Sequence, residues 1–306
     1  MKILVATQKP FSAAAVAGIQ EIVTAAGHTF ALLEKYPGQD ELMAAAADAD
    51  ALIIRSDKVT AEVLDAAKSL KIVVRAGAGF DNVDLAAATA HGVVVMNTPG
   101  QNSNAVAELA IAMMIYMART QFTPATGSEI MGKQLGIQAF GNVGRLVGKK
   151  AEALGMRVMA IDPFIPAERI SEAGAVPAAS LEELYSSCDY VSIHIPATPQ
   201  TIGSIGYELV SKMPKGAVLV NTARKEVIDE EGLAKALRER PDLKYITDVA
   251  PDSYAAMQEE FGLRVFATPK KMGAQTAEAN MNAGLAAARQ IVDYFATGNT
   301  RFQVNK

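Results

Sequence analysis

Three small residues and one carboxylate lie at the spacing that a dinucleotide site requires. Ala139 lies near the end of the apolar run 135–140, Gly141 and Gly144 follow the run and open a helical pattern, and Asp162 ends the next apolar run. A small residue at 139 permits a tight turn, and Gly141 lets backbone N–H groups approach a pyrophosphate. Gly144 lets the helix and the strand pack closely. The stretch predicts a strand, a phosphate-binding turn, a helix and a second strand.

Asp162 bears on which dinucleotide this turn would bind. It lies 18 residues beyond Gly144, where a carboxylate could accept hydrogen bonds from an adenosine ribose. A 2′-phosphate would meet a negative charge there, so the sequence predicts NAD and not NADP. Asn142 and Val143 complete the predicted cofactor-binding turn. The alternative is an ordinary strand-to-helix turn in a parallel sheet.

Ala139 departs from the usual pattern, because the first position of G-x-G-x-x-G is normally glycine. Alanine fits this position without strain when its φ angle is negative. Ala139 therefore weakens the match to the motif.

Two arginines follow strand-like runs in the first third of the chain. Arg55 ends LIIR and Arg75 ends IVVR, so both are expected at the carboxyl ends of strands, where α/β proteins bind ligands. Two arginines suit a phosphate better than a lactate-sized substrate. Ser56 follows the first arginine, and Ala76 and Gly77 follow the second, where backbone N–H groups could receive a carboxylate. The alternative is a pair of rim charges on a sheet.

The elements that position these residues alternate in type along the chain. Short β-rich runs alternate with alanine-rich helical stretches up to residue 97, and the alternation resumes at Gln134. The pattern predicts an α/β protein with two doubly wound parallel-sheet domains. We expect a flavodoxin-like substrate domain made of residues 1–98 and 282–306, with a Rossmann NAD-binding domain, residues 99–281, inserted in it.

Composition excludes several classes of protein. The chain has 306 residues, a net charge of −4 and no basic field of the kind that binds nucleic acid. No apolar run reaches 18 residues, so no membrane span is expected. The single cysteine, Cys188, excludes an internal disulfide and a cysteine-based zinc site. The N-terminal apolar run is too short for a signal peptide, so we expect a cytoplasmic protein without metal.

Several segments together resemble the D-2-hydroxyacid dehydrogenases. They are IIRSDKVT, VVRAGAGFDNVDLAAAT, NTPGQNSNAVAELA, the dinucleotide stretch, VSIHIPATPQTIGSIG, and VNTARKEVIDEEGLAKAL followed by TDV. IIRS and RAGAGFDNVD look most like the members that act on phosphoglycerate, in a short form without C-terminal regulatory domains. The resemblance implies NAD-linked oxidation of 3-phospho-D-glycerate to 3-phosphohydroxypyruvate, the entry to serine biosynthesis. It also implies a homodimer.

The resemblance assigns catalytic roles to residues near the end of the second domain. Arg224, in NTAR, would bind the substrate carboxylate and carbonyl, since its guanidinium is a rigid fork. The family usually has a histidine where this chain reads ATPKKMGAQT, which places Lys271 there in one register and Lys270 in the other. We favour Lys271. Asp252 is the candidate for the family's orienting acid.

A lysine can exchange a proton in both directions of such a reaction. As an ammonium it donates to a developing alkoxide, and as a neutral amine it accepts a proton, which requires its pKa to fall from about 10.4. Arg224 and the second lysine would lower it. In the alternative, the two lysines form a solvated turn and the protein has lost its proton shuttle. Lys225 and Glu226 replace two family glycines. Lys225 could add positive charge near the phosphate, or the two could pair with each other in solvent, and we favour the second.

The resemblance adds a second group of cofactor positions, and three functions stay open. The added positions are His194, Ile195, Pro196, Thr222, Ala223 and Asp248, the last as a partner of the nicotinamide carboxamide. The first function is the phosphoglycerate-oxidising dehydrogenase. The second is a glyoxylate or hydroxypyruvate reductase of the same family, and the third is an NAD-binding sensor without turnover.

Overall fold

A computed structural model describes residues 1–306, and the chain divides into two compact units. Unit 1 comprises Met1–Asn102 and Gln275–Lys306, and unit 2 comprises Ser103–Ala274. Unit 1 is therefore built from two separate stretches of chain, whereas unit 2 is continuous. No helix is long and apolar enough to cross a membrane.

Unit 1 is a five-stranded parallel sheet in the order β2-β1-β3-β4-β5. Its strands are β1 (Lys2–Thr7), β2 (Thr29–Glu34), β3 (Ala51–Ile54), β4 (Ile72–Arg75) and β5 (Val94–Asn97). Its helices are α1 (Ala13–Ala25), α2 (Gln39–Ala46), α3 (Ala61–Ala66), α4 (Leu85–Ala90) and α12 (Ala277–Thr297). The strand order is the flavodoxin-like one, with its switch point between β1 and β3.

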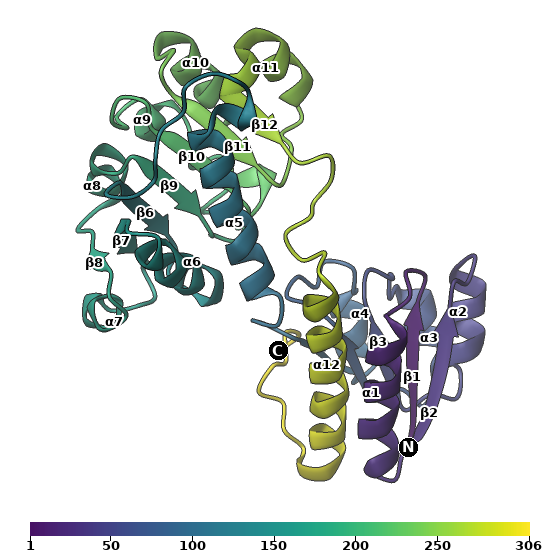
Figure 1. The fold of residues 1–306 in the computed structure, drawn as a ribbon. Helices are drawn as coiled ribbons and strands as arrows, with labels where there is room; N and C mark the ends of the chain where they lie inside the picture. Colours follow the sequence, from purple (N-terminus) through teal and green to yellow (C-terminus); the bar gives the residue numbers. More distant parts are fainter. The chain divides into compact units, whose positions relative to one another are not determined.

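Alternation along β1 explains how both faces of this sheet are covered. Ile3 and Val5 point into a core with α1 and α12, while Leu4 and Ala6 point into a core with α2, α3 and α4. Period-two alternation places successive side chains on opposite faces. α12, yellow in Figure 1, packs beside α1, so the C-terminal stretch completes one face of the N-terminal sheet.

Unit 2 is a seven-stranded parallel sheet in the order β12-β11-β10-β9-β6-β7-β8. Its strands are β6 (Gln134–Gln138), β7 (Arg157–Ile161), β8 (Val176–Pro177), β9 (Tyr190–Ile193), β10 (Val218–Asn221), β11 (Lys244–Thr247) and β12 (Val265–Ala267). Its helices are α5 (Ser103–Ala118), α6 (Asn142–Ala153), α7 (Ala167–Glu172), α8 (Leu181–Ser187), α9 (Tyr207–Val210), α10 (Glu230–Glu239) and α11 (Tyr254–Phe261).

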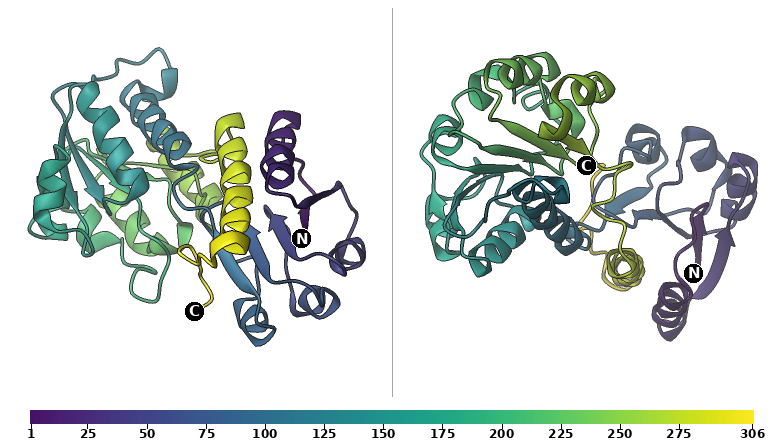
Figure 2. Two further views of the ribbon diagram at one scale, coloured as in Figure 1. Left: turned by 90° about the horizontal axis from the view of Figure 1, so that it is seen from below. Right: turned by 45° about the horizontal axis from the view of Figure 1, so that its top comes forward.

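Helices cover both faces of the unit 2 sheet. α5, α6 and α7 pack on one face and α8, α9, α10 and α11 on the other, an arrangement visible in the right panel of Figure 2. The strand order turns between β6 and β9, so the carboxyl ends of these two strands flank the switch point. The prediction of two doubly wound parallel-sheet domains is confirmed.

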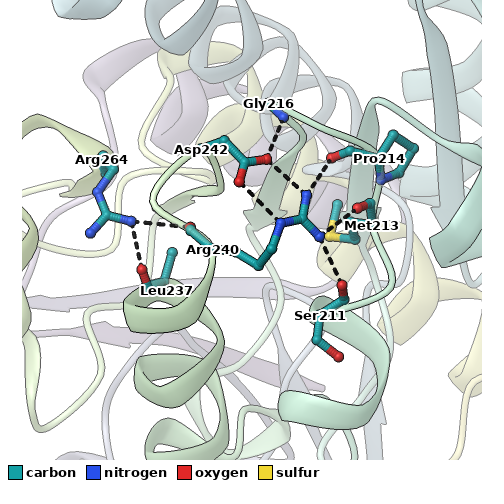
Figure 3. Close-up of polar contacts among 8 residues, drawn as sticks. All are labelled: Ser211, Met213, Pro214, Gly216, Leu237, Arg240, Asp242 and Arg264. Carbon is teal, nitrogen blue, oxygen red and sulfur yellow. Dashed lines mark hydrogen bonds and ion pairs between the residues drawn. The ribbon is translucent and has the colours of Figure 1, made fainter.

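Arg240 and Asp242 hold the turn that precedes β10 against the end of α10. The Arg240 guanidinium donates to the carbonyl oxygens of Ser211, Met213 and Pro214 at 2.9, 3.2 and 3.4 Å (Figure 3). It also donates twice to the Asp242 carboxylate, at 3.0 and 2.8 Å, and this carboxylate accepts the Gly216 N–H at 2.8 Å. This pairing with Arg240 lowers the pKa of Asp242 well below its usual range.

Candidate functional site

The small-residue turn after β6 has the geometry of a phosphate-binding turn. Gly141 is the N-cap of α6 and has no side chain that could cap the helix. The first backbone N–H groups of α6 therefore receive no hydrogen bond acceptor from the N-cap residue and can face an anion. A Cβ on Gly141 would meet no atom within 4 Å, which leaves open space beside the turn. A Cβ on Gly144 would lie 2.3 Å from the Ala139 carbonyl oxygen. The close approach expected at Gly144 is therefore present.

The φ angle of Ala139 is +75°, so the condition under which alanine fits the first position without strain is not met. Its N–H donates to the Ile161 carbonyl at 2.9 Å, which continues the pairing of β6 with β7 before the chain turns into α6. The turn requires a left-handed residue at the first position of the pattern, where glycine is the usual choice. Alanine adopts this conformation at a cost on the order of 1–2 kcal/mol.

Asp162 supports the same turn with its carboxylate. One oxygen accepts the Phe140 N–H at 2.8 Å, and the other accepts the Phe164 N–H at 2.8 Å. A carboxylate has about four acceptor positions, so acceptor capacity remains for ribose hydroxyls. The residue therefore fixes the turn and stays suited to the predicted ribose contact.

His194, directly after β9, ties that strand to β6. Its N–H donates to the Gln138 carbonyl at 2.9 Å, and its Nε2 lies 3.0 Å from the Ser192 hydroxyl. Burial lowers the pKa of His194 to about 4, so the imidazole is neutral at pH 7. Ile195 is buried, and the Pro196 carbonyl accepts the Thr201 hydroxyl at 2.6 Å. These contacts shape the switch-point loop.

Asn221 shapes the loop that carries Arg224. Its side chain accepts the Ala223 N–H at 2.9 Å and donates to the Arg224 carbonyl at 2.9 Å. The Arg224 guanidinium donates to the Ala223 carbonyl at 2.9 Å. The Thr222 hydroxyl is buried and has no hydrogen-bond partner within the chain. A buried hydroxyl normally has a partner, so Thr222 fits a bound cofactor.

Asp252 and Lys225 form an ion pair of 2.5 Å, and this corrects one expectation. Lys225 was expected to pair with Glu226, but the Asp252 carboxylate is its partner and raises its pKa. Glu230, a residue that the sequence did not single out, accepts the N–H groups of Asp252 and Ser253, each at 2.9 Å. The expected orienting acid is therefore committed to Lys225.

The two candidate lysines lie on residues 268–273, hereafter the lysine loop, which follows β12. Asp248, directly after β11, is 1% exposed and accepts the Met272 N–H at 2.7 Å and the Gly273 N–H at 2.8 Å. It also accepts the Thr268 hydroxyl at 2.8 Å. The residue predicted to bind the nicotinamide carboxamide thus already has three partners in the lysine loop.

All of these unit 2 residues lie at one edge of the sheet. Each follows the carboxyl end of a strand: Ala139 after β6, Asp162 after β7, His194 after β9, Arg224 after β10, Asp248 after β11 and Lys270 after β12. In doubly wound sheets, ligands bind at this edge. The sheet therefore gathers the predicted cofactor and catalytic residues on one side.

In unit 1, Arg55 lies at the switch point between β1 and β3. Its guanidinium donates to the Lys9 and Pro10 carbonyls at 2.8 and 3.0 Å and to the Asn280 side chain, and it stacks over the Phe11 ring at 5.0 Å. Burial lowers its pKa. Arg55 therefore has an architectural role beside any role in phosphate binding.

Arg75 lies directly against its neighbouring loop. Its Nε donates to the Arg55 carbonyl at 3.0 Å, and a Cβ on Gly77 would lie 1.4 Å from Arg75 Nη1. Gly77 has a φ of +152°, and the Ala76 N–H donates to the Ile54 carbonyl at 2.8 Å. Glycine at 77 is what allows the guanidinium to lie over this loop.

Asp57 is a buried carboxylate in the same region that the sequence did not single out. It accepts the Gln8 N–H and the Tyr36 hydroxyl, each at 2.7 Å, and the Arg55 N–H at 3.3 Å. The carboxylate thereby joins the segments that follow β1, β2 and β3, and it raises the pKa of Tyr36 together with burial. Ser56 beside it is exposed. The sequence signal that could have identified Asp57 is its place shortly after the apolar run that forms β3.

Comparison with known proteins places the chain in a family. Residues 105–270 match the model of the D-isomer specific 2-hydroxyacid dehydrogenase, NAD binding domain. The chain belongs to the D-isomer specific 2-hydroxyacid dehydrogenase family, and the predicted family and its NAD-binding domain are confirmed. No group of three or more histidine, cysteine or acidic side chains is arranged to hold a metal ion.

Within this family, named phosphoglycerate dehydrogenases are among the similar proteins. The crystal structure of cofactor (NAD+)-bound 3-phosphoglycerate dehydrogenase from Entamoeba histolytica is 50% identical, with a TM-score of 0.88, over 100% of this chain and 99% of that one. D-3-phosphoglycerate dehydrogenase of Mycobacterium tuberculosis is 37% identical over 83% of this chain. This chain matches 51% of that protein, so it spans about half the length of the curated phosphoglycerate dehydrogenases it matches.

A relative with another name is equally similar in sequence. Hydroxypyruvate reductase of Thermotoga maritima is 37% identical over 83% of this chain and 87% of its own length. Sequence similarity alone therefore leaves the substrate open within the family.

Proposed function

We propose that this protein oxidises 3-phospho-D-glycerate to 3-phosphohydroxypyruvate with NAD, and catalyses the reverse reduction. The observation that carries the proposal is the placement of Arg224 and the two lysines at the sheet edge that also holds the NAD-type turn. The 50% identity with the Entamoeba histolytica dehydrogenase supports this choice of substrate.

In the proposed mechanism, NAD would, when bound, supply the acceptor for the hydride that leaves C2 of the substrate. Arg224 binds the carboxylate and the C2 oxygen, because its guanidinium donates in parallel to two oxygens. Lys271 removes the hydroxyl proton during oxidation and returns it during reduction. Gly141 to Gly144 would hold the pyrophosphate, Asp162 the ribose, and the loop from Thr222 to Arg224 the nicotinamide.

The substrate phosphate is assigned to Arg75, with the N–H groups of Ala76 and Gly77 receiving anionic oxygens. The Arg55 guanidinium makes three hydrogen bonds within unit 1. The Arg55 carbonyl accepts a hydrogen bond from Arg75 Nε, so we assign Arg55 the role of supporting Arg75. Ser56, which follows Arg55, is exposed, and its hydroxyl is assigned to the substrate as well.

The similarity to a hydroxypyruvate reductase supports a second candidate function, reduction of an unphosphorylated 2-oxo acid. NADH absorbance with 3-phosphohydroxypyruvate, hydroxypyruvate and glyoxylate separates the two. We expect the highest kcat/KM with the phosphorylated substrate. Turnover of glyoxylate alone would overturn the first proposal, and absence of turnover with every 2-oxo acid would favour a non-catalytic NAD sensor.

We further propose that the protein forms a homodimer through unit 2. The family resemblance implies a homodimer, and Phe122 and Met131, which follow α5, are 70% and 69% exposed and so available to an interface. Light scattering after size exclusion measures the mass directly. A monomer at micromolar concentration would contradict this proposal.

A further inference from the structure

The lysine loop contains no helix or strand, so its shape depends on hydrogen bonds from elsewhere in unit 2. Met272 and Gly273, which directly follow Lys271, donate their N–H groups to the Asp248 carboxylate at 2.7 and 2.8 Å. Two successive N–H groups that converge on a carboxylate fix the φ and ψ angles between them. The backbone that carries the proposed proton shuttle is therefore set by Asp248.

Asp248 is itself held in place. It lies directly after β11, its N–H donates to the Asn221 carbonyl at 2.9 Å, and its side chain is buried. Asn221 also fixes the loop of Arg224 through its side chain. One short stretch of the sheet edge thus positions both the proposed carboxylate-binding arginine and the proposed proton-transferring lysine.

Gly273 confirms how closely the loop approaches this carboxylate. A Cβ at 273 would lie 3.1 Å from Asp248 Oδ2 and 3.2 Å from Val106 Cγ2, both tighter than ordinary contacts. The Thr268 hydroxyl lies 2.8 Å from Asp248 Oδ1 and 2.9 Å from the Lys270 carbonyl, so it can donate its proton to either one. The carboxylate therefore contacts the loop on both sides of the lysine pair.

We propose that Asp248 is a positioning residue that holds the lysine loop in its active shape through the N–H groups of Met272 and Gly273. The inference rests on the proposed function, because it gives the loop its importance through Lys271. Three of about four acceptor positions of the carboxylate are taken by the chain itself. Holding the lysine loop is therefore its task within the chain, beside any contact with the cofactor.

The test replaces Asp248 with asparagine, which keeps the shape of the side chain but turns one acceptor into a donor. Asp248→Asn then directs an NH2 group at one of the loop N–H groups, and the loop must move. We expect kcat for 3-phosphohydroxypyruvate to fall about 10²-fold, the scale of a misplaced catalytic group. The Kd of NADH, from protein fluorescence, and KM should each change less than about threefold.

A measurement independent of turnover follows the loop itself. Hydrogen–deuterium exchange of a peptide that covers residues 268–276 should become at least about tenfold faster in Asp248→Asn, since two protected N–H groups lose their acceptor. Thr268→Val, which keeps the carboxylate, should show a smaller change in the same direction, and Thr268→Ser should behave as wild type. Glu182→Gln, which removes an equal charge from a surface pair with Lys212, is the matched control.

The outcomes separate this inference from its alternatives. Wild-type exchange and kcat in Asp248→Asn would overturn it, as would a loss confined to NADH affinity, which would assign Asp248 to the cofactor alone. If Asp248→Asn does not fold, Thr268→Val decides by the same two measurements. If the wild type turns over no 2-oxo acid, the proposed function fails, whereas exchange in the loop still tests whether Asp248 holds it.

Discussion

Lys271 and Lys270 are adjacent, but only Lys271 directly precedes the N–H groups that Asp248 fixes. We predict that Lys271→Ala lowers kcat by a factor of about 10²–10⁴, the usual scale of general acid–base catalysis. Lys270→Ala should lower kcat far less. Steady-state reduction of 3-phosphohydroxypyruvate measures both variants. An inactive Lys270→Ala beside a near-normal Lys271→Ala would assign the proton shuttle to the other register.

Ala139 offers a test of strain at a single residue. Because its φ is +75°, Ala139→Gly should raise the free energy of unfolding by about 0.5–1 kcal/mol, after the greater unfolded-state entropy of glycine is subtracted. Urea unfolding followed by circular dichroism measures the change. Ala173→Gly, at a residue with φ of −88°, is the control and should not stabilise. A loss of stability in Ala139→Gly would contradict the left-handed conformation.

At the scale of elements, the pair Arg240–Asp242 joins the end of α10 to the turn before β10. The folded-state pKa of Asp242 is lowered, so its contribution to stability is fully present above its unfolded pKa of about 4 and is lost as pH falls. We predict that Asp242→Asn lowers the free energy of unfolding by roughly 2 kcal/mol at pH 7. The difference from wild type should shrink as pH falls below about 4.

Urea titrations at several pH values measure this difference. Glu172→Gln, which removes an exposed surface pair with Arg169, is the matched control and should change stability much less. A gap between Asp242→Asn and wild type that stays constant down to pH 2 would show that the carboxylate contributes by shape and not by charge.

The sequence predicted the strands of the two sheets but not the side-chain contacts between elements. Short, continuous apolar runs such as KILVAT and YVSI became strands, because burial on both faces demands continuous apolar residues. The pairing of Lys225 with Asp252 and the contacts of Asp57 with Gln8 and Tyr36 could not be predicted. They join residues far apart in sequence, and no local pattern encodes which side chains the sheet will bring together.

The whole molecule consists of two units with different chain continuity. Both hydrophobic cores of unit 2 contain only residues from within Ser103–Ala274, whereas one core of unit 1 needs Ala283, Ala287 and Ile291 from α12. A chain that stops at residue 102 would leave Ile3, Val5 and their neighbours on one sheet face without this cover. The two units should therefore differ in their capacity to fold alone.

We predict that residues 103–274 expressed alone fold cooperatively and bind NADH, while residues 1–102 alone do not fold. NADH at 100 times its Kd should stabilise the isolated unit 2 by about 2.7 kcal/mol, because it binds only the folded state. Thermal unfolding with and without NADH measures this, and Asp162→Ala in the same fragment should reduce the shift. A cooperative melt of residues 1–102 would show that unit 1 does not need α12 to fold. A unit 2 fragment whose unfolding temperature does not change with NADH would show that cofactor binding depends on the intact chain.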